Sequence, residues 1–343
     1  MKTVGKRIKR VTRDTEFWVF LIIIMLSLII QVRSGQFYTN NNIVDILRSM
    51  IYPSMCAIPA LLAFVSTGPD VSFPLIGALS SYLAIIITVN TGFQGSWIVT
   101  YLIAIFFGSL MGALNGFIIV KYKFPALIVT LGTSSIFSGL LLGAFQAQRM
   151  NLPENLQKFG KATLLTVKNA QTGLGSTLPY TFVILVVLYV LAYIVLNYTM
   201  VGRGVYAIGG DEIAAERAGF NVKAIRFWIF VINGAVAGIA GLSYAVMSMR
   251  YLPTEYAGGE MVVIAAIVLG GTRLNGGVGS LRGCLLGTLL VTMVTNSLIL
   301  VGISVYWQKV FIGGIIIIGT IIPMVLNSAG RKMRIRERKA PEK

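Results

Sequence analysis

The chain has 343 residues, of which 56% are hydrophobic and only 12% are charged. About a quarter of the residues of a soluble domain are charged, so this composition excludes a soluble globular protein and indicates an integral membrane protein. The formal net charge of +17 gathers at the two ends of the chain, where it favours contact with a membrane surface over nucleic-acid binding, since no nucleic-acid motif accompanies it.

The apolar runs are continuous and do not alternate with polar residues, which predicts spanning helices rather than a β-barrel. The expected fold class is an all-α integral membrane protein with about ten transmembrane helices and two regions broken by Gly or Pro. The expected spans are 17–32, 46–66, 71–90, 97–120, 124–145, 178–198, 227–249, 259–271, 281–301 and 305–327. They form a transmembrane domain (17–327) between a basic N-terminus (1–16) and a basic tail (328–343).

The distribution of Lys and Arg predicts the orientation of these spans. If both termini are cytoplasmic, 21 of the 29 Lys and Arg residues fall on the cytoplasmic side, in agreement with the positive-inside rule. In this arrangement the segment 199–226 is cytoplasmic and the loop 146–178 lies on the outer side. We therefore expect both termini to be cytoplasmic.

The first predicted helix break lies at 66–74, where two prolines and a glycine fall within seven residues. Broken helices in membrane proteins face protein or line a polar path, so Thr67, Asp70 and Ser72 are candidates for a substrate path. Alternatively, Asp70 and Ser72 only cap the restarted helix. Asp70 is also the only carboxylate well inside the predicted membrane region, and a third interpretation makes it a proton carrier.

Polar residues within the later spans extend this candidate path, or else form hydrogen bonds between helices. They are Asn115, Thr130, Thr133, Asn233 and Asn296. Glycines spaced four apart at 108, 112 and 116 predict a face on which a second helix packs closely.

Two segments on the predicted outer side stand apart from the spans. The residues 37–49 predict a surface helix that leads into the second span. The loop 146–178 is polar and contains one proline and three glycines. It is interpreted either as a docking surface or as a simple connector.

The segment 199–226 is charged and punctuated by glycine between two long apolar runs, so it is the main element that can meet a partner in water. Asp211 is placed to cap a short helix, and Gly219 to end it in the left-handed conformation. Three alanines offer a smooth face for a partner. The candidate docking residues are Asp211, Glu212, Ala214, Ala215, Glu216, Arg217, Ala218 and Gly219.

The second predicted break lies at 270–280 and contains five glycines. Together with the glycine of the first break, the helix-break glycines are Gly68, Gly270, Gly271, Gly276, Gly277 and Gly279. The segment matches neither a P-loop nor a dinucleotide-binding fingerprint. The chain has no His, and Cys56 and Cys284 both fall inside apolar runs. We therefore expect no metal site, and no set of residues suited to catalysis.

Several motifs, in order along the chain, resemble the membrane permease subunits of bacterial ABC importers for simple sugars, the ribose, xylose, galactose and autoinducer-2 group. The resemblance runs from about Ile43 to Leu326. Its strongest parts are Phe-Pro-Ala-Leu-Ile-Val-Thr-Leu-Gly-Thr (124–133), Val-Tyr-Ala-Ile-Gly-Gly (205–210), Ala-Gly-Phe-Asn-Val (218–222), Val-Leu-Gly-Gly-Thr (268–272) and Gly-Gly-Val-Gly-Ser (276–280).

The resemblance implies a location in the bacterial inner membrane and import by alternating access. Its implied partners are a second permease copy or paralogue, an extracytoplasmic solute-binding protein and a cytoplasmic ABC ATPase that binds ATP and Mg. No cofactor is implied for this chain, and 211–219 would be the coupling helix. The chain departs from the family at the first break, where Asp70 and Ser72 match the usual Ser-Gly-Gly-Ile-Asp-Leu-Ser-Val-Gly pattern but Thr67, Pro69, Phe73 and Pro74 do not.

The leading hypothesis is therefore an ABC permease for a small hydroxylated solute such as a monosaccharide. Nucleosides and autoinducer-2 are alternatives within the same mechanism. An ion-coupled secondary transporter is the alternative from another class, although it would normally have more ionisable groups in the membrane than Asp70. A membrane enzyme is disfavoured by the absence of His and of paired acids.

Overall fold

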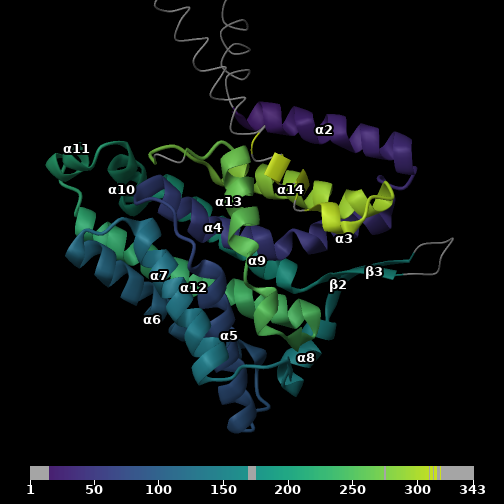
Figure 1. The fold of residues 1–343 in the computed structure, drawn as a ribbon, viewed down its shortest axis with the longest axis horizontal. Coiled ribbons are helices and arrows are strands. Elements are labelled where there is room, and N and C mark those ends of the chain that lie inside the picture. The colour runs from purple at the N-terminus through teal and green to yellow at the C-terminus, as the bar shows by residue number, and fades with distance from the viewer. Residues whose placement is uncertain are drawn as a thin grey trace, which may run out of the picture.

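The computed structural model describes residues 15–168, 175–273 and 276–308, together with 310, 311, 313, 314 and 317. Helices dominate this part of the chain (Figure 1). The α-helices are α2 (Thr15–Ser34), α3 (Asn40–Ser49), α4 (Ile51–Ser66), α5 (Phe73–Asn90), α6 (Trp97–Tyr122), α7 (Ala126–Gly139), α8 (Glu154–Lys161), α9 (Thr181–Tyr198), α10 (Met200–Gly210), α11 (Glu212–Arg217), α12 (Val222–Ser248), α13 (Gly259–Leu269) and α14 (Leu281–Leu300). A π-helical turn, η1 (Leu140–Ala144), extends α7, and η2 (Pro253–Glu255) and η3 (Val305–Trp307) are 3₁₀ turns.

Eight helical segments of the described residues are long and apolar enough to cross a membrane, which confirms the multi-pass, all-α prediction. The predicted span 259–271 is instead the 11-residue helix α13. At 1.5 Å per residue, such a helix covers about 16 Å of a hydrocarbon core about 30 Å thick. The predicted span 305–327 lies largely outside the described residues, as do the basic segments 1–16 and 328–343 apart from Thr15 and Glu16.

The segment 37–49 is predicted to form a surface helix that leads into the second span, and α3 does lead into α4. The two helices are joined by the single residue Met50, whose backbone is helical (φ −80°, ψ −10°). The two helices together make one apolar stretch, Asn40–Ser66, of 27 residues. Pro53 has no N–H to donate to the Ser49 carbonyl, so the joint lacks one helical hydrogen bond, while the Ser54 N–H still donates to the Met50 carbonyl at 2.9 Å. We conclude that this segment belongs to the second span.

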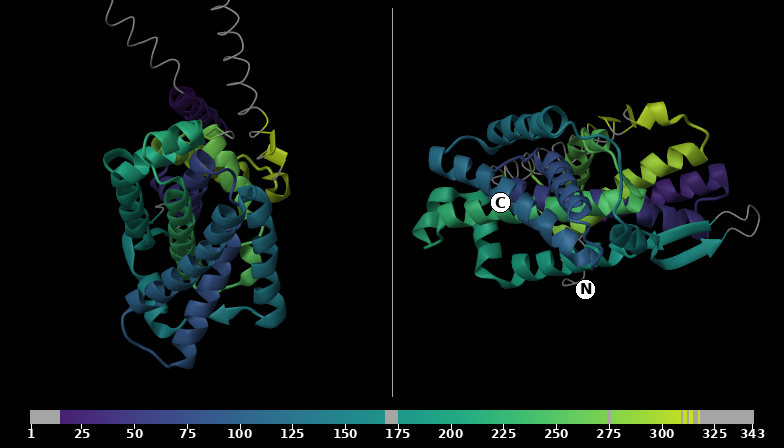
Figure 2. Two further views of the ribbon diagram at one scale, coloured as in Figure 1. Left: turned by 90° about the vertical axis from the view of Figure 1, so that its left-hand side faces the viewer. Right: turned by 90° about the horizontal axis from the view of Figure 1, so that it is seen from below.

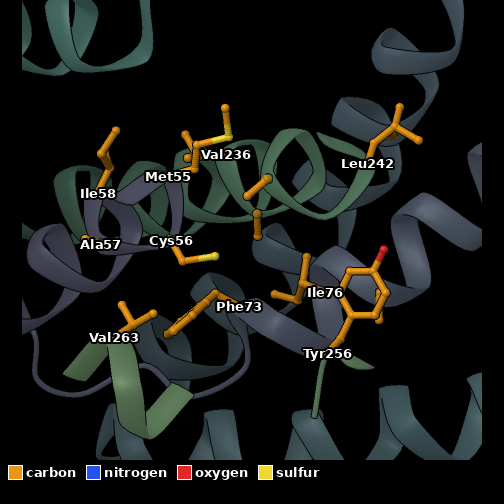
Figure 3. Packing of buried hydrophobic residues seen from close by; sticks show 14 of the residues in the cluster. Met55, Cys56, Ala57, Ile58, Phe73, Ile76, Val236, Leu242, Tyr256 and Val263 are labelled. Carbon is orange, nitrogen blue, oxygen red and sulfur yellow. The ribbon is translucent and has the colours of Figure 1, made fainter. Parts of the chain in front are cut away.

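The buried core lies around α4, α5 and α12. Of the apolar window in each span, 83% is buried in Asn40–Ser66 and 72% in both α5 and α12, but only 22% in α2 and 17% in α9. Figure 3 shows Cys56 of α4, Phe73 and Ile76 of α5 and Val236 of α12 packed within one core. A helix that is apolar all round is buried, so α4 is the central helix, and α2 and α9 are peripheral and expose apolar side chains.

Helix α6 has two different faces. One face carries Gly108, Gly112 and Gly116, which meet the backbone of α12: a Cβ added at Gly112 would fall on the carbonyl oxygen of Phe230. The opposite face exposes a stripe of large apolar side chains, namely Ile98, Leu102, Phe106, Leu110, Leu114 and Phe117. The predicted close-packing glycine face is confirmed, and the other face is suited to lipid.

Short strands occur in the predicted outer loop, where no strand was expected. β2 (Thr163–Lys168) and β3 (Gly175–Pro179) form an antiparallel pair, and β1 (Met150–Asn151) pairs with β4 (Arg250–Tyr251). The β2–β3 pair projects from one end of the molecule, and α10 and α11 lie at the opposite end (Figures 1 and 2). The 146–178 loop and the 199–226 segment therefore occupy opposite ends, as the orientation argument requires.

Candidate functional site

The first helix break is confirmed: α4 ends at Ser66 and α5 begins at Phe73. Between them, Asp70 turns its carboxylate onto the restarting helix. Its Oδ1 accepts hydrogen bonds from the backbone N–H of Ser72 at 2.8 Å and from the Ser72 hydroxyl at 2.7 Å. The Ser72 side chain makes no capping bond to α5, so it bonds Asp70 instead of acting as a cap.

This break is embedded in a polar cluster contributed by three other helices. The Asn115 side-chain amide of α6 donates to Ser72 Oγ at 2.9 Å, and Thr130 Oγ1 of α7 accepts from the Val71 N–H at 3.3 Å. The Asn233 amide of α12 lies beside the Asp70 carboxyl group. We call Asp70, Ser72, Asn115, Thr130 and Asn233 the break cluster. Each of these residues is at most 1% exposed.

The other predicted path residues lie outside this cluster. Thr67 is half-buried and its hydroxyl shares a hydrogen bond of 3.0 Å with that of Ser66. Thr133 is buried one turn further along α7 and donates to the Thr130 carbonyl at 3.4 Å. Asn296 is half-buried on α14, which packs chiefly against α13, α2 and α4. The structure thus brings five of the eight predicted residues together and leaves Asn296 apart.

The second break, 270–280, joins α13 to α14; among its described residues, the Ser280 hydroxyl donates to Glu16 of α2 and accepts from the Gly283 N–H at 2.9 Å. Four of the six predicted helix-break glycines have positive φ angles, namely Gly68, Gly271, Gly276 and Gly277. The other two allow close packing, with Gly270 against the backbone of Gly283 and Gly279 against Leu61 and Val65. At φ +73° Gly277 adopts a conformation that disfavours any residue with a Cβ.

The two breaks meet each other and α10. The N–H of Gly277 donates to the carbonyl of Val65, at the end of α4, at 2.9 Å. From α10, the Tyr206 hydroxyl donates to the Gly279 carbonyl at 3.0 Å. Gly209 of α10 lies against both, because an added Cβ would overlap the Val65 carbonyl oxygen and approach the Gly277 nitrogen to 2.5 Å. α10 is thus in direct contact with both helix breaks.

The predicted short helix in 199–226 is α11. The Asp211 side chain accepts a hydrogen bond from the Ala214 N–H at 3.0 Å, and Gly219 follows the helix with φ +88°, so both end signals are confirmed. A bidentate ion pair between Glu212 and Arg226, at 2.8 Å, ties α11 to α12.

The expectation that three alanines share one docking face is wrong for Ala215. It is buried against Ile208 and Val222, whereas Ala214 and Ala218 are exposed. The exposed face also includes Ile213, which is 63% exposed and which sequence reasoning missed. An apolar residue amid charged neighbours was the available signal. The helix α10, a large part of the same segment, was also not predicted.

The structure also forms a cluster that the sequence analysis did not predict, near the end of the molecule that carries β1 and β4. The rings of Tyr52 and Tyr244 lie 4.7 Å apart, and Tyr256 packs edge-on against Tyr244 at 5.3 Å. Beside them, Arg250 and Glu255 form an ion pair of 2.6 Å that is partly exposed. We call the three tyrosines, with this ion pair, the aromatic cluster. Its members are spread over more than 200 positions of the sequence, so no local sequence pattern predicts that they meet.

Comparison with known proteins finds a match between residues 42–320 and the family described as branched-chain amino acid transport system / permease component. The ribose import permease protein RbsC of Escherichia coli (strain K12) is 28% identical over 306 residues, covering 88% of this chain and 91% of that protein. The probable ABC transporter permease protein YphD of the same strain is 30% identical, with 93% and 92% covered. The autoinducer 2 import system permease protein LsrC of Photorhabdus luminescens is 27% identical, with 92% and 91% covered.

No solved structure matches the chain. The family match covers most of its length and includes both helix breaks, the break cluster and α10–α11. The alignments with the three permeases named above also cover nearly the whole length of each of those proteins. The chain therefore belongs to the branched-chain amino acid transport system / permease component family of multi-pass membrane proteins.

Proposed function

We propose that this chain is the transmembrane permease subunit of an ATP-driven ABC importer that takes up a small hydroxylated solute, a monosaccharide in the first instance. One observation carries the mechanism: α10 is in contact with both helix breaks and leads directly into the exposed α11. Movement imposed on α11 from water is transmitted to the two places where spanning helices are interrupted. The relatives named for ribose and autoinducer 2 import support the class of solute.

The exposed face of α11 is the proposed contact for a cytoplasmic ABC ATPase, which binds ATP and Mg in place of this chain. Ile213, Ala214 and Ala218 supply an apolar surface without bulky charge. The opposite end, with the β2–β3 pair, is the proposed contact for an extracytoplasmic solute-binding protein. A second permease copy or paralogue completes the assembly, in an inner membrane with both termini cytoplasmic.

The aromatic cluster supports a hydroxylated solute. The half-buried rings of Tyr52 and Tyr244 offer faces to the apolar side of a sugar ring, with the buried Tyr256 packed behind them. The Arg250–Glu255 pair offers donors and acceptors to the sugar hydroxyl groups. Among the described residues, Asp70 is the only Asp, Glu, Lys or Arg that is buried, which suits a neutral solute. Autoinducer 2 and nucleosides are hydroxylated as well and remain alternatives within this mechanism.

The α11 assignment is tested by Ala214→Arg in the affinity-tagged full chain. A bulky cation on the exposed face should abolish recovery of the ATPase subunit and ATP-dependent uptake, without loss of membrane insertion. Ala257→Arg is the matched control for membrane insertion and ATPase recovery, because Ala257 is an exposed alanine beyond α12, on the opposite end from α11.

Both variants are purified in mild detergent, and the recovered proteins are identified by mass spectrometry. Normal ATPase recovery by Ala214→Arg would refute the docking face. Uptake by the unmodified chain that survives ATP depletion but stops when the proton or sodium gradient is collapsed would instead establish an ion-coupled secondary transporter.

A further inference from the structure

The break cluster contains buried oxygen atoms that lack a hydrogen-bond partner among the described residues. They are Oδ2 of Asp70, Oδ1 of Asn115 and Oδ1 of Asn233. All three residues are at most 1% exposed. Buried polar atoms in folded proteins are nearly always paired, and an unpaired one is costly, so these three oxygens require a partner.

The hydrogen-bond donors of the cluster cannot supply that partner. The Ser72 hydroxyl is committed to Asp70, and the Asn115 amide to Ser72. Only the Asn233 amide nitrogen is left without a partner of good hydrogen-bond geometry, and it lies beside the Asp70 carboxyl group, to which it can donate. Asp70 forms no ion pair with any described residue. Three acceptors against one donor is a deficit of donors, because the Asn233 amide can satisfy one oxygen at most and two remain.

The packing of α6 against α12 brings these side chains to one place. Gly112 of α6 meets the backbone of Phe230 and Gly234 of α12, so the two helix backbones are in contact there. Asn233 directly precedes Gly234, and Asn115 follows Gly112 by one turn. Ser72 bonds both Asp70 and Asn115, which holds the first break at this crossing.

We propose that the break cluster binds one sodium ion through Asp70 Oδ2, Asn115 Oδ1 and Asn233 Oδ1. A single carboxylate balances one positive charge, and carboxylate and amide oxygens suit a hard cation. No group of three His, Cys, Asp or Glu side chains occurs in the described part of the chain, so the donors do not suit a divalent transition metal.

This site does not depend on the proposed function. Its role is to hold the start of α5 against α6 and α12, whatever solute the protein carries. The ion neutralises Asp70 and links three helices that otherwise touch through glycine and backbone.

The test is thermal unfolding of the purified full chain in NaCl, KCl and choline chloride at equal ionic strength. We expect a saturable rise in melting temperature with sodium, a smaller one with potassium and none with choline. Asp70→Asn should remove the rise, because the neutral amide loses the balancing charge while its shape is kept. Ser135→Ala, at an exposed hydroxyl of α7, should retain it. Equal melting temperatures in all three salts would overturn the proposal.

The second test measures the binding of ²²Na⁺ to the unmodified chain and its displacement by unlabelled sodium. It shows whether the chain binds sodium even if Asp70→Asn does not fold. One displaceable ion per chain supports the site. An absence of binding, combined with a melting temperature in choline that rises as the pH falls, would show that Asp70 holds a proton and would overturn the sodium assignment.

Discussion

In both helix breaks the interrupted backbone must be held in place, and the two breaks do this by different means. In the first break, side chains hold the interrupted backbone: Asp70 bonds Ser72, and Ser72 is bonded by Asn115. In the described part of the second break, glycines with positive φ angles make close backbone contacts, and Ser280 supplies side-chain hydrogen bonds to Glu16 and from the Gly283 N–H. The first break is therefore sensitive mainly to the chemistry of its side chains, and the second mainly to volume and conformation at its glycines.

The breaks are nevertheless one mechanical unit, because Gly277 of the second donates to Val65 beside the first. α10 contacts both through Gly209 and Tyr206. We call the contact of α10 with Val65 and Gly277 the junction. A substitution at the junction should affect both breaks, whereas a substitution within one break should affect that break alone. Three substitutions test this difference.

The largest effect is expected from Gly209→Ala. The added methyl group would overlap the Val65 carbonyl oxygen and press on Gly277, and such overpacking costs about 1–3 kcal/mol. Uptake by the assembled importer should fall tenfold or more, and thermal stability should fall with it. The matched control is Gly210→Ala, since a Cβ there has nothing within 4 Å. Similar uptake by the two variants would show that the junction is not closely packed.

Ser72→Ala should have an intermediate effect that is confined to the first break. It leaves Asp70 Oδ1 with one bond fewer and the buried Asn115 amide without a partner, which costs about 1–3 kcal/mol. The measurement is the free energy of unfolding in mild detergent, with Ser135→Ala, an exposed serine, as control. A loss no greater than that of Ser135→Ala would mean that side chains do not hold this break.

Tyr206→Phe should have the smallest effect, because it removes one hydrogen bond to the Gly279 carbonyl and no packing volume. The expected loss is about 0.5–1.5 kcal/mol, and Tyr198→Phe, at a 70% exposed tyrosine, should lose nothing. If Tyr206→Phe reduced uptake as severely as Gly209→Ala, the hydrogen bond rather than close packing would couple α10 to the second break.

Local features of the structure followed from local sequence. Long apolar runs became helices, the Pro- and Gly-rich stretches became breaks, and Asp211 and Gly219 bounded α11, because each of these effects acts within a few residues. The glycines spaced by four in α6 were placed on one face for the same reason. Predictions failed where the outcome depends on packing partners, as with Ala215 and with the short helix α13.

The sequence by itself determined the class of protein, its spanning helices and the residue types at each break, because hydropathy and backbone preference are local properties. Only the tertiary structure decided which polar residues meet, for Asn115, Thr130 and Asn233 join Asp70 while Asn296 does not. It also decided that α10 touches both breaks. The physical reason is that the crossing of α6 and α12, fixed by backbone contact at glycine, sets which side chains are brought together across more than 100 residues of chain.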